Sequence, residues 1–284
     1  MRPISIPTFT DKLVQEVMRM ILEAVYEPIF LDVSHGFRPN RSCHTALEQI
    51  KHEFTGVRWF VEGDIKGCFD NIDHETLVSI VNRKIKDARF IQLLWKILKA
   101  GYLEDWRYNK TFSGTPQGGI ISPILANIYL HELDKKVMVI RQNCYKPRER
   151  AYTPEYSKLQ HELRAIKTKI SRAEGEEKAG LIRELKEVRK RQRNTPCVSQ
   201  TDKRLSYVRY ADDFIIGVVG SREDCERIKQ ELTEYVAEEL KMELSAEKTL
   251  ITHSNNKARF LGYDIRVRRD SKVKKTKAGR KVRT

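Results

Sequence analysis

The sequence predicts an α+β protein in which an antiparallel sheet is backed by helices. Short apolar segments at residues 59–65, 205–210 and 214–219 have the length and composition of buried strands. Residues 211–213, Ala-Asp-Asp, separate the last two segments and fit a hairpin turn. Other segments, beginning with residues 11–29, carry apolar residues at helical spacing instead.

The helices are expected to alternate with these strands along the chain. Thr10 or Asp11 could cap the first helix, and Pro28 lies near its end. Pro123 suits the first turn of a later helix. The remaining helices are predicted from their apolar periodicity at residues 42–50, 74–81, 90–100, 124–139 and 221–240. Short strands are predicted within residues 249–252 and 259–267.

Residues 141–204 differ in character and are predicted to form a helical hairpin that is inserted into the main fold. One apolar stripe lies in residues 159–170, and a second lies in residues 181–188, after a break at Gly175. The other residues of this stretch are charged and mostly basic. A solvated hairpin and a nucleic-acid-binding surface are both compatible with this pattern.

The charge of the chain indicates a polyanionic partner. The 284 residues carry a formal net charge of +15, and basic residues release counterions when they bind phosphates. A basic surface without any partner is the alternative. The five cysteines form no C-x-x-C pair, which argues against a disulfide framework or a zinc cluster and predicts an intracellular protein. No segment has the uninterrupted apolar length of a membrane span.

Three carboxylates border the predicted strands: Asp64, Asp212 and Asp213. Acidic groups beside buried strands are costly unless a partner neutralises them, and a shared cation would do so. Nucleotidyl transfer uses such an arrangement, with two divalent ions about 3.5–4 Å apart. Mg²⁺ prefers carboxylate oxygens and substrate phosphates. An isolated Asp-Asp pair could equally be an ordinary hairpin turn.

The residues around these acids resemble the motifs of reverse transcriptases. Residues 210–213 resemble the Tyr-x-Asp-Asp box, residues 64–74 the first catalytic motif, and residues 114–123 the nucleotide-binding motif. Residues 2–7 and 36–42 resemble fingers motifs of the reverse transcriptases encoded by group II introns, often called maturases. The resemblance covers nearly the whole chain, with the motifs in the family's order.

The resemblance implies the fingers and palm of a right-hand polymerase, with an antiparallel palm sheet backed by helices. Residues 1–57 would be partial fingers, and residues 58–140 the first part of the palm, with the nucleotide-binding motif at the junction. Residues 141–204 would be the basic helical hairpin insertion, and residues 205–267 the rest of the palm. Residues 268–284 would be a basic tail. The N-terminal extension, thumb and X domain are expected to be absent.

The resemblance also implies two Mg²⁺ ions, for which Mn²⁺ can substitute. Asp64 and Asp212 would bind both ions, the backbone carbonyl of Ile65 would be a further ligand, and Asp213 would be a supporting acid. Lys248 would be a general acid for the leaving pyrophosphate.

Substrate-binding roles follow from the same motifs. Phe69 would be the steric gate that selects deoxynucleotides; a plain core Phe is the alternative. Gln117 and Gly118 would lie against the incoming nucleotide. Lys12 and Arg19 would grip its triphosphate unless they are simply solvated. The primer-grip hairpin would include Phe260, Leu261 and Gly262.

The implied activity is RNA-directed DNA synthesis for a group II intron, in support of splicing and mobility. The partners would be intron RNA as template, a DNA or RNA primer, dNTPs, and a second copy in a homodimer. One alternative is an RNA-binding splicing cofactor that uses the insertion together with Arg38 and Arg41. Another is a retron, diversity-generating or CRISPR-associated reverse transcriptase. The expected location is the bacterial cytoplasm, or an organelle for a eukaryotic source.

Overall fold

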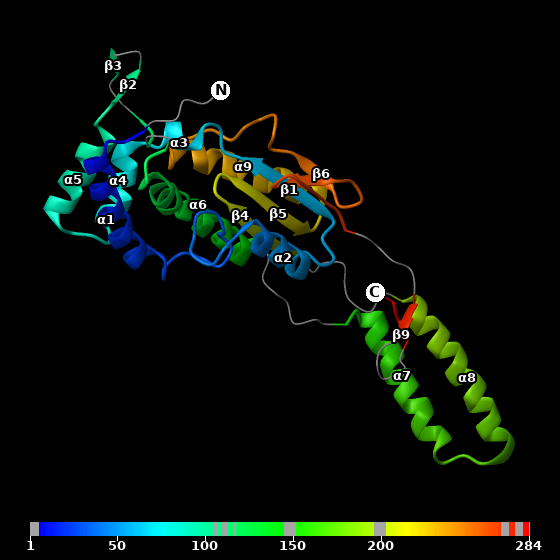
Figure 1. Ribbon diagram of the computed structural model, residues 1–284. Coiled ribbons are helices and arrows are strands. Elements are labelled where there is room, and N and C mark those ends of the chain that lie inside the picture. The colour runs from blue at the N-terminus through cyan, green and yellow to red at the C-terminus, as the bar shows by residue number, and fades with distance from the viewer. Residues whose placement is uncertain are drawn as a thin grey trace. The chain divides into compact units, whose positions relative to one another are not determined.

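The computed structural model describes residues 6–104, 107–109, 113–115, 118–144, 152–195, 203–267, 273–275 and 281–283. The chain divides into two compact units, one of residues 1–144 with 205–284 and one of residues 145–204. The first unit contains a four-stranded sheet with helices, and the second is a helical hairpin (Figure 1). The predicted α+β class with an antiparallel sheet is confirmed.

The central sheet is ordered β4-β5-β1-β6. Its strands are β1 (Trp59–Asp64), β4 (Arg204–Tyr210), β5 (Asp213–Val219) and β6 (Ile251–His253). β1 pairs antiparallel with both β5 and β6. β4 and β5 are neighbours joined through residues 211–212, so the predicted hairpin forms there. The pairing brings the end of β1 beside the turn of a hairpin that lies far away in sequence.

Local capping explains where the helices of this unit begin. Thr8, rather than the predicted Thr10 or Asp11, caps α1, because its hydroxyl accepts from the Asp11 backbone N–H. Capping boxes start α2 at Ser42 and α9 at Ser221. The helices of this unit are α1 (Phe9–Tyr26), α2 (Cys43–Glu53), α3 (Cys68–Asn71), α4 (His74–Asn82), α5 (Ala88–Leu98), α6 (Ser122–Cys144) and α9 (Arg222–Glu238).

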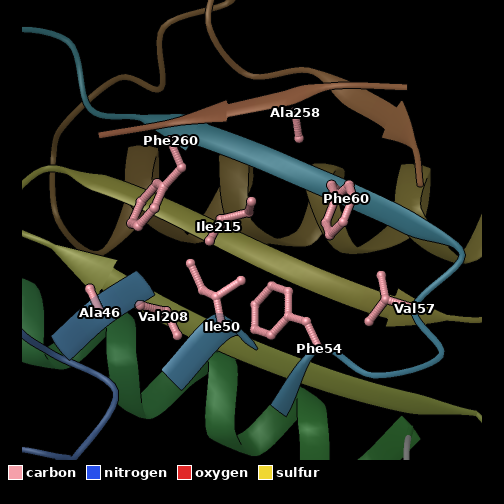
Figure 2. Close-up of a cluster of buried hydrophobic side chains, with 9 residues drawn as sticks. All are labelled: Ala46, Ile50, Phe54, Val57, Phe60, Val208, Ile215, Ala258 and Phe260. Atoms are coloured by element: carbon pink, nitrogen blue, oxygen red, sulfur yellow. The ribbon is translucent and has the colours of Figure 1, made fainter. Parts of the chain in front are cut away.

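One face of the sheet is covered by α2. Ile50 and Phe54 of α2 point toward Phe60 of β1 and Ile215 of β5 (Figure 2). Gly217 leaves room for this helix, because a Cβ there would lie 2.7 Å from the Phe54 ring. The buried members of this cluster are Ala46, Ile50, Phe54, Val57, Phe60, Val208, Ile215, Ala258 and Phe260. The packing of α2 on the strands therefore involves no residue of the predicted metal site.

The other face packs against helices and contains Phe214 and Tyr207, both almost fully buried. Their rings are 6.1 Å apart. Gly63 on the neighbouring strand is needed here, since a Cβ would lie 2.1 Å from the Phe214 ring. α9 contacts β1 and β6, and α6 contacts α9. Side chains alternate between the two faces along a strand. One face of the sheet, which holds Glu62, therefore packs against α2, and the other packs against the layer that contains α9.

Short hairpins complete the first unit. β7 (Ala258–Phe260) pairs with β8 (Tyr263–Ile265) through a turn at Leu261 and Gly262. Both turn residues have positive φ, as a two-residue hairpin turn requires. β2 (Tyr102–Glu104) pairs with β3 (Arg107–Asn109), and β9 (Val273–Lys275) pairs with β10 (Lys281–Arg283) within the predicted basic tail.

The second unit consists of α7 (Pro154–Ile170) and α8 (Gly175–Asn194), as the two apolar stripes predicted. Leu163, Ile166 and Val188 form its buried core. Residues 141–144 belong to α6, so the compact unit begins later than the predicted boundary at residue 141. No helix in the described part of the chain has the length and apolar character needed to cross a membrane.

Candidate active site

The register of the sheet brings the predicted acids together. Asp64, the last residue of β1, is the direct partner of Asp213, the first residue of β5. Directly opposed residues of an antiparallel pair project from the same face, so these two carboxylates are neighbours. Asp212 lies one residue earlier, in the turn. Asp64 and Asp213, 149 positions apart in the sequence (213 − 64), thus meet at one end of the sheet.

The electrostatics show that the three acids interact. Burial first, and then the negative charges of Asp212 and Asp64, raise the pKa of Asp213 to about 6. Burial and the charges of Asp212 and Asp64 also raise the pKa of the buried Cys68 thiol, to about 12. Both acids therefore lie close to Cys68 as well as to Asp213. The like charges of this cluster therefore disfavour ionisation of Asp213, a cost that a bound cation would remove.

Lys248 supplies a cation to this site. Its Nζ donates to Asp64 Oδ2 at 3.0 Å. The hydrogen bond to Asp64 raises the pKa of Lys248, with further contributions from Asp213 and Asp212. The ammonium group is largely exposed, whereas the side chain of Asp64 is only 13% exposed. The predicted general acid therefore lies in the carboxylate cluster and is held in its protonated form.

The donor chemistry of the cluster fits a hard divalent cation, because such cations prefer carboxylate oxygens. Among the described residues, no group of three or more His, Cys, Asp or Glu side chains is already arranged around a metal position. Asp64 accepts from Lys248 through one carboxylate oxygen, Oδ2, so a bound cation would compete with Lys248 for this carboxylate.

Backbone hydrogen bonds near Asp64 determine which way the carbonyl of Ile65 points. Asp64 O accepts from Ser245 N at 2.8 Å, and Lys66 N donates to Glu243 O at 2.9 Å. Successive backbone groups of a strand point to opposite edges. The carbonyl of Ile65 therefore faces the edge of β1 on which Asp213 lies.

Replacing Asp213 by Asn is expected to stabilise the metal-free protein at pH 7. The raised pKa of Asp213 means that its ionised form is disfavoured in the folded state, and this cost is present above pH 6 and absent below pH 4. The group is partly exposed, so the gain in the free energy of unfolding should be about 1–2 kcal/mol. Urea denaturation with a chelator at pH 7 and pH 4 measures it; a less stable variant at pH 7 would contradict the expectation.

Phe69 lies beside residues 114 and 115 of the glycine-rich loop, and its role as a gate stays a prediction. Thr115 N donates to Phe69 O at 2.7 Å, and Gly114 N donates to Ile72 O at 2.8 Å. Gly114 has φ +82, and a Cβ there would lie 2.6 Å from Asp70 O. Only glycine permits this approach. Gly118 is exposed with φ +97, whereas Gln117 lies outside the described residues.

Lys12 and Arg19, the predicted triphosphate-binding residues on α1, differ in their surroundings. Lys12 is exposed. Arg19 is paired with Glu16 at 2.7 Å and also with Glu23. Binding a triphosphate through Arg19 would require these pairs to break, so the geometry favours Lys12.

Arg38 and Arg41, the predicted RNA-binding residues, are both paired with acids. The Arg38 side chain is 4% exposed and bound to Glu27 at 2.8 Å. Its Nη1 donates to the carbonyls of Leu31 and Ser34. Arg41 is paired with Asp32 at 2.6 Å. Their role in RNA binding stays a prediction, and the burial of Arg38 does not favour it.

The predicted primer grip is attached to β1 by Glu62. Glu62 Oε2 accepts from Arg259 N at 2.8 Å, and Thr252 donates to the other carboxylate oxygen. Phe260 is buried in the α2 core, while Leu261 and Gly262 form the tip. Of the three predicted residues, Phe260 thus anchors the hairpin, and Leu261 and Gly262 form its turn.

A buried ion pair beneath the turn at residues 211–212 was not predicted. Arg209 and Asp134 are both 0% exposed and are joined at 2.7 Å by two hydrogen bonds. Arg209 Nη1 also donates to Ala211 O at 2.8 Å, and its Nη2 donates to Ser34 Oγ at 2.8 Å. The guanidinium therefore connects Ala211, the residue before Asp212, with the segment that contains Ser34.

A sequence signal for this network existed. An Arg within an apolar strand is costly unless an acid pairs with it. Asn127, His131 and Asp134 mark one polar stripe on the otherwise apolar face of α6. Asn127 Oδ1 does accept from Arg209 Nη1, at 3.1 Å. The stripe could have identified α6 as the partner of Arg209.

Comparison with known proteins places this geometry in a family. The family model described as "Reverse transcriptase (RNA-dependent DNA polymerase)" matches residues 1–171 and 181–265. The chain belongs to the reverse transcriptase family. Members of this family generally use divalent metal ions, which agrees with the carboxylate cluster.

Two relatives of this reverse transcriptase domain are informative. The group II intron-encoded protein LtrA of Lactococcus lactis subsp. cremoris is 62% identical over 276 residues, 97% of this chain and 46% of that protein. The putative COX1/OXI3 intron 2 protein of Saccharomyces cerevisiae is 40% identical over 94% of this chain and 30% of that protein. The resemblance to group II intron reverse transcriptases is confirmed. The chain spans about half the length of the Lactococcus protein.

A solved structure supports the fold of the reverse transcriptase domain. Apo telomerase from Candida tropicalis, truncated from its C-terminal domain, matches 89% of this chain and 43% of that chain. The TM-score is 0.52 and the sequence identity is 14%, so the likeness concerns the fold alone. It agrees with the fingers and palm arrangement predicted from the motifs.

Proposed function

We propose that the chain carries the active site of an RNA-directed DNA polymerase encoded by a group II intron. The observation that carries the proposal is the meeting of Asp64, Asp212 and Asp213 at one end of the sheet, with Lys248 among them. The 62% identity to a group II intron-encoded protein favours this type over the retron, diversity-generating and CRISPR-associated alternatives.

Asp64 and Asp212 would hold two divalent ions, Mg²⁺ or its substitute Mn²⁺, with the Ile65 carbonyl as a further ligand. When bound, the ions would stabilise the attacking 3′-oxygen of the primer and the leaving pyrophosphate. Asp213 would support the cluster. Lys248, once released from Asp64, would offer a proton from Nζ to the leaving pyrophosphate.

The substrate would be a dNTP directed by an RNA template. Phe69 would exclude a ribose 2′-hydroxyl, and the backbone at Gly118 would lie close to the nucleotide. Lys12, with Arg19 once its pairs break, would bind the triphosphate, and the tip at Leu261 would contact the primer. These assignments are supported by the docking of residues 114–115 on Phe69 and by the attachment of the hairpin to Glu62.

RNA binding through the insertion is a second part of the proposal. Residues 145–204 contain seventeen Lys and Arg against nine Asp and Glu, a net charge of +8 out of +15 for the chain. A fifth of the chain therefore carries about half of the net charge. This surface would bind intron RNA and assist splicing, which is also what the alternative splicing cofactor would do without polymerisation.

Self-association into a homodimer is a further proposal. Leu13, Val17 and Met20 on α1 are more than half exposed, and together they offer an apolar surface for a second copy.

Single-turnover primer extension tests the catalytic proposal. Excess protein is mixed with an RNA template, an annealed primer and one dNTP, with and without Mg²⁺. We expect addition of one deoxynucleotide that requires both the RNA template and the metal. Absence of any addition, at protein concentrations that saturate the primer-template, would contradict the proposed activity.

Neutralising the basic face of α8 is expected to weaken RNA binding. The variant replaces Lys186, Arg189, Lys190 and Arg193 by Gln; all four side chains are exposed. Each lost phosphate contact should reduce the slope of log affinity against log salt concentration by roughly 0.7–0.9. Filter binding across a salt series measures the slope.

The matched control replaces Glu176 and Glu177 of the same helix by Gln. These residues are exposed and carry the opposite charge, so the control should bind RNA at least as tightly as the wild type. An unchanged slope in the basic-face variant would exclude the insertion as an RNA-binding surface.

A further inference from the structure

Phe37 occupies a position that packing does not explain. Its backbone has φ +55, a left-handed conformation that is rare for a bulky residue and costs conformational energy. Its side chain is 52% exposed, so burial does not offset this cost. Neither burial nor backbone preference therefore explains an aromatic residue at this position.

The residues on either side fix this conformation. Gly36 packs directly on the turn at residues 211–212: a Cβ at Gly36 would lie 2.3 Å from Ala211 N. Asn127 Nδ2 donates to Gly36 O at 2.7 Å, and Arg38 on the other side is held by Glu27. The backbone of Phe37 is therefore anchored at both ends, which fixes the point from which the ring projects.

The ring of Phe37 meets the ring of Phe69. Their centroids are 6.1 Å apart and their planes are inclined by 75°, an edge-to-face contact. Phe69 is half-buried and lies in the four-residue helix α3. Its backbone is held by Thr115, which leaves the direction of the ring to be decided by side-chain contacts such as this one.

We propose that Phe37 is a positioning residue that determines sugar specificity. It holds the ring of Phe69 in the orientation that blocks a ribose 2′-hydroxyl, so that deoxynucleoside triphosphates are selected over ribonucleoside triphosphates. The proposal rests on the proposed function of Phe69 as the steric gate. Selection between the two sugars would then depend on two rings: Phe37, in the loop that packs on the turn at residues 211–212, and Phe69, in α3.

The test compares kcat/KM for a dNTP with kcat/KM for the matching rNTP. Phe37→Ala should reduce the ratio by on the order of 3- to 10-fold, the value of one edge-to-face contact. Phe37→Gly also removes the ring but relieves the backbone strain, since glycine adopts positive φ freely. Both variants should lose discrimination alike, whereas Phe37→Tyr should retain it. A merely structural role would change both substrates equally and leave the ratio unaltered.

Two controls separate this inference from the proposal on which it rests. Phe9→Ala removes another exposed Phe, 77% exposed on α1, and should leave the ratio unchanged. Phe69→Ala should lower the ratio more than Phe37→Ala does, and the double variant should lower it no further. If Phe69→Ala leaves the ratio unchanged, the gate itself is wrong. If Phe69→Ala lowers the ratio and the Phe37 variants do not, only the role of Phe37 is wrong.

Discussion

Replacing Asp212 and Asp213 together by Ala is expected to abolish primer extension while RNA binding persists. The two carboxylates lie at the end of the sheet beside Asp64, where Asp212 would hold the divalent ions together with Asp64 and Asp213 would support the cluster. Losing several kcal/mol of transition-state stabilisation from the ions lowers the rate by roughly three orders of magnitude or more. RNA binding should be unaffected, because the proposed basic surface lies in residues 145–204.

The matched control for this variant is Glu176→Ala with Glu177→Ala, which removes the same charge from two adjacent exposed acids. It should extend the primer at the wild-type rate. Single-turnover extension and filter binding are measured on the same preparations. Extension by the Asp212 and Asp213 variant at the original rate would eliminate the enzymatic interpretation and leave the RNA-binding one.

Asp134→Ala is expected to cause a large loss of fold stability. It leaves the guanidinium of Arg209, which is 0% exposed, without its acidic partner. Removing one partner of a buried ion pair costs about 3–5 kcal/mol, because the remaining charge stays buried. Tyr207 loses the acceptor of its hydroxyl as well, at 2.8 Å. Urea denaturation at neutral pH measures the loss in the free energy of unfolding.

A surface ion pair provides the comparison. Asp264 is paired with Lys257 at 2.7 Å, and both side chains are at least half exposed. Asp264→Ala should therefore cost less than about 1 kcal/mol. Replacing both buried partners, by Arg209→Met with Asp134→Leu, should recover part of the stability lost in Asp134→Ala, because no charge then stays buried without a partner. The recovery should be incomplete, because Tyr207 and Ser34 still lose a hydrogen-bond partner. Equal losses at Asp134 and Asp264 would show that the buried pair has no special role.

The arrangement of the three carboxylates was largely predictable from the sequence because it depends on strand pairing. Apolar segments mark β1, β4 and β5, and an acid lies at one end of β1 and at the hairpin turn. The motif resemblance then indicated that Asp64 and Asp212 belong to one site. The pairing of Asp64 with Asp213 rather than with Asp212 depends on the register, which one residue of shift would change.

Tertiary contacts explain what the sequence did not reveal. Arg38 and Arg41 were assigned to RNA because of their charge, but folding gives each an acidic partner. The left-handed backbone of Phe37 adjoins the packing of Gly36 on Ala211, a long-range contact that no local pattern indicates. The pairing of Asp64 with Lys248 is likewise a property of side chains that lie 184 positions apart.

A crystal structure of the protein with Mn²⁺ and a dNTP, with anomalous scattering used to locate the metal, tests the shared metal site most directly. We predict anomalous peaks in contact with carboxylate oxygens of both Asp64 and Asp212, and Lys248 Nζ moved away from Asp64. Manganese bound elsewhere, with Asp64 still paired to Lys248 in the presence of the nucleotide, would contradict the claim that these acids form one metal-binding centre.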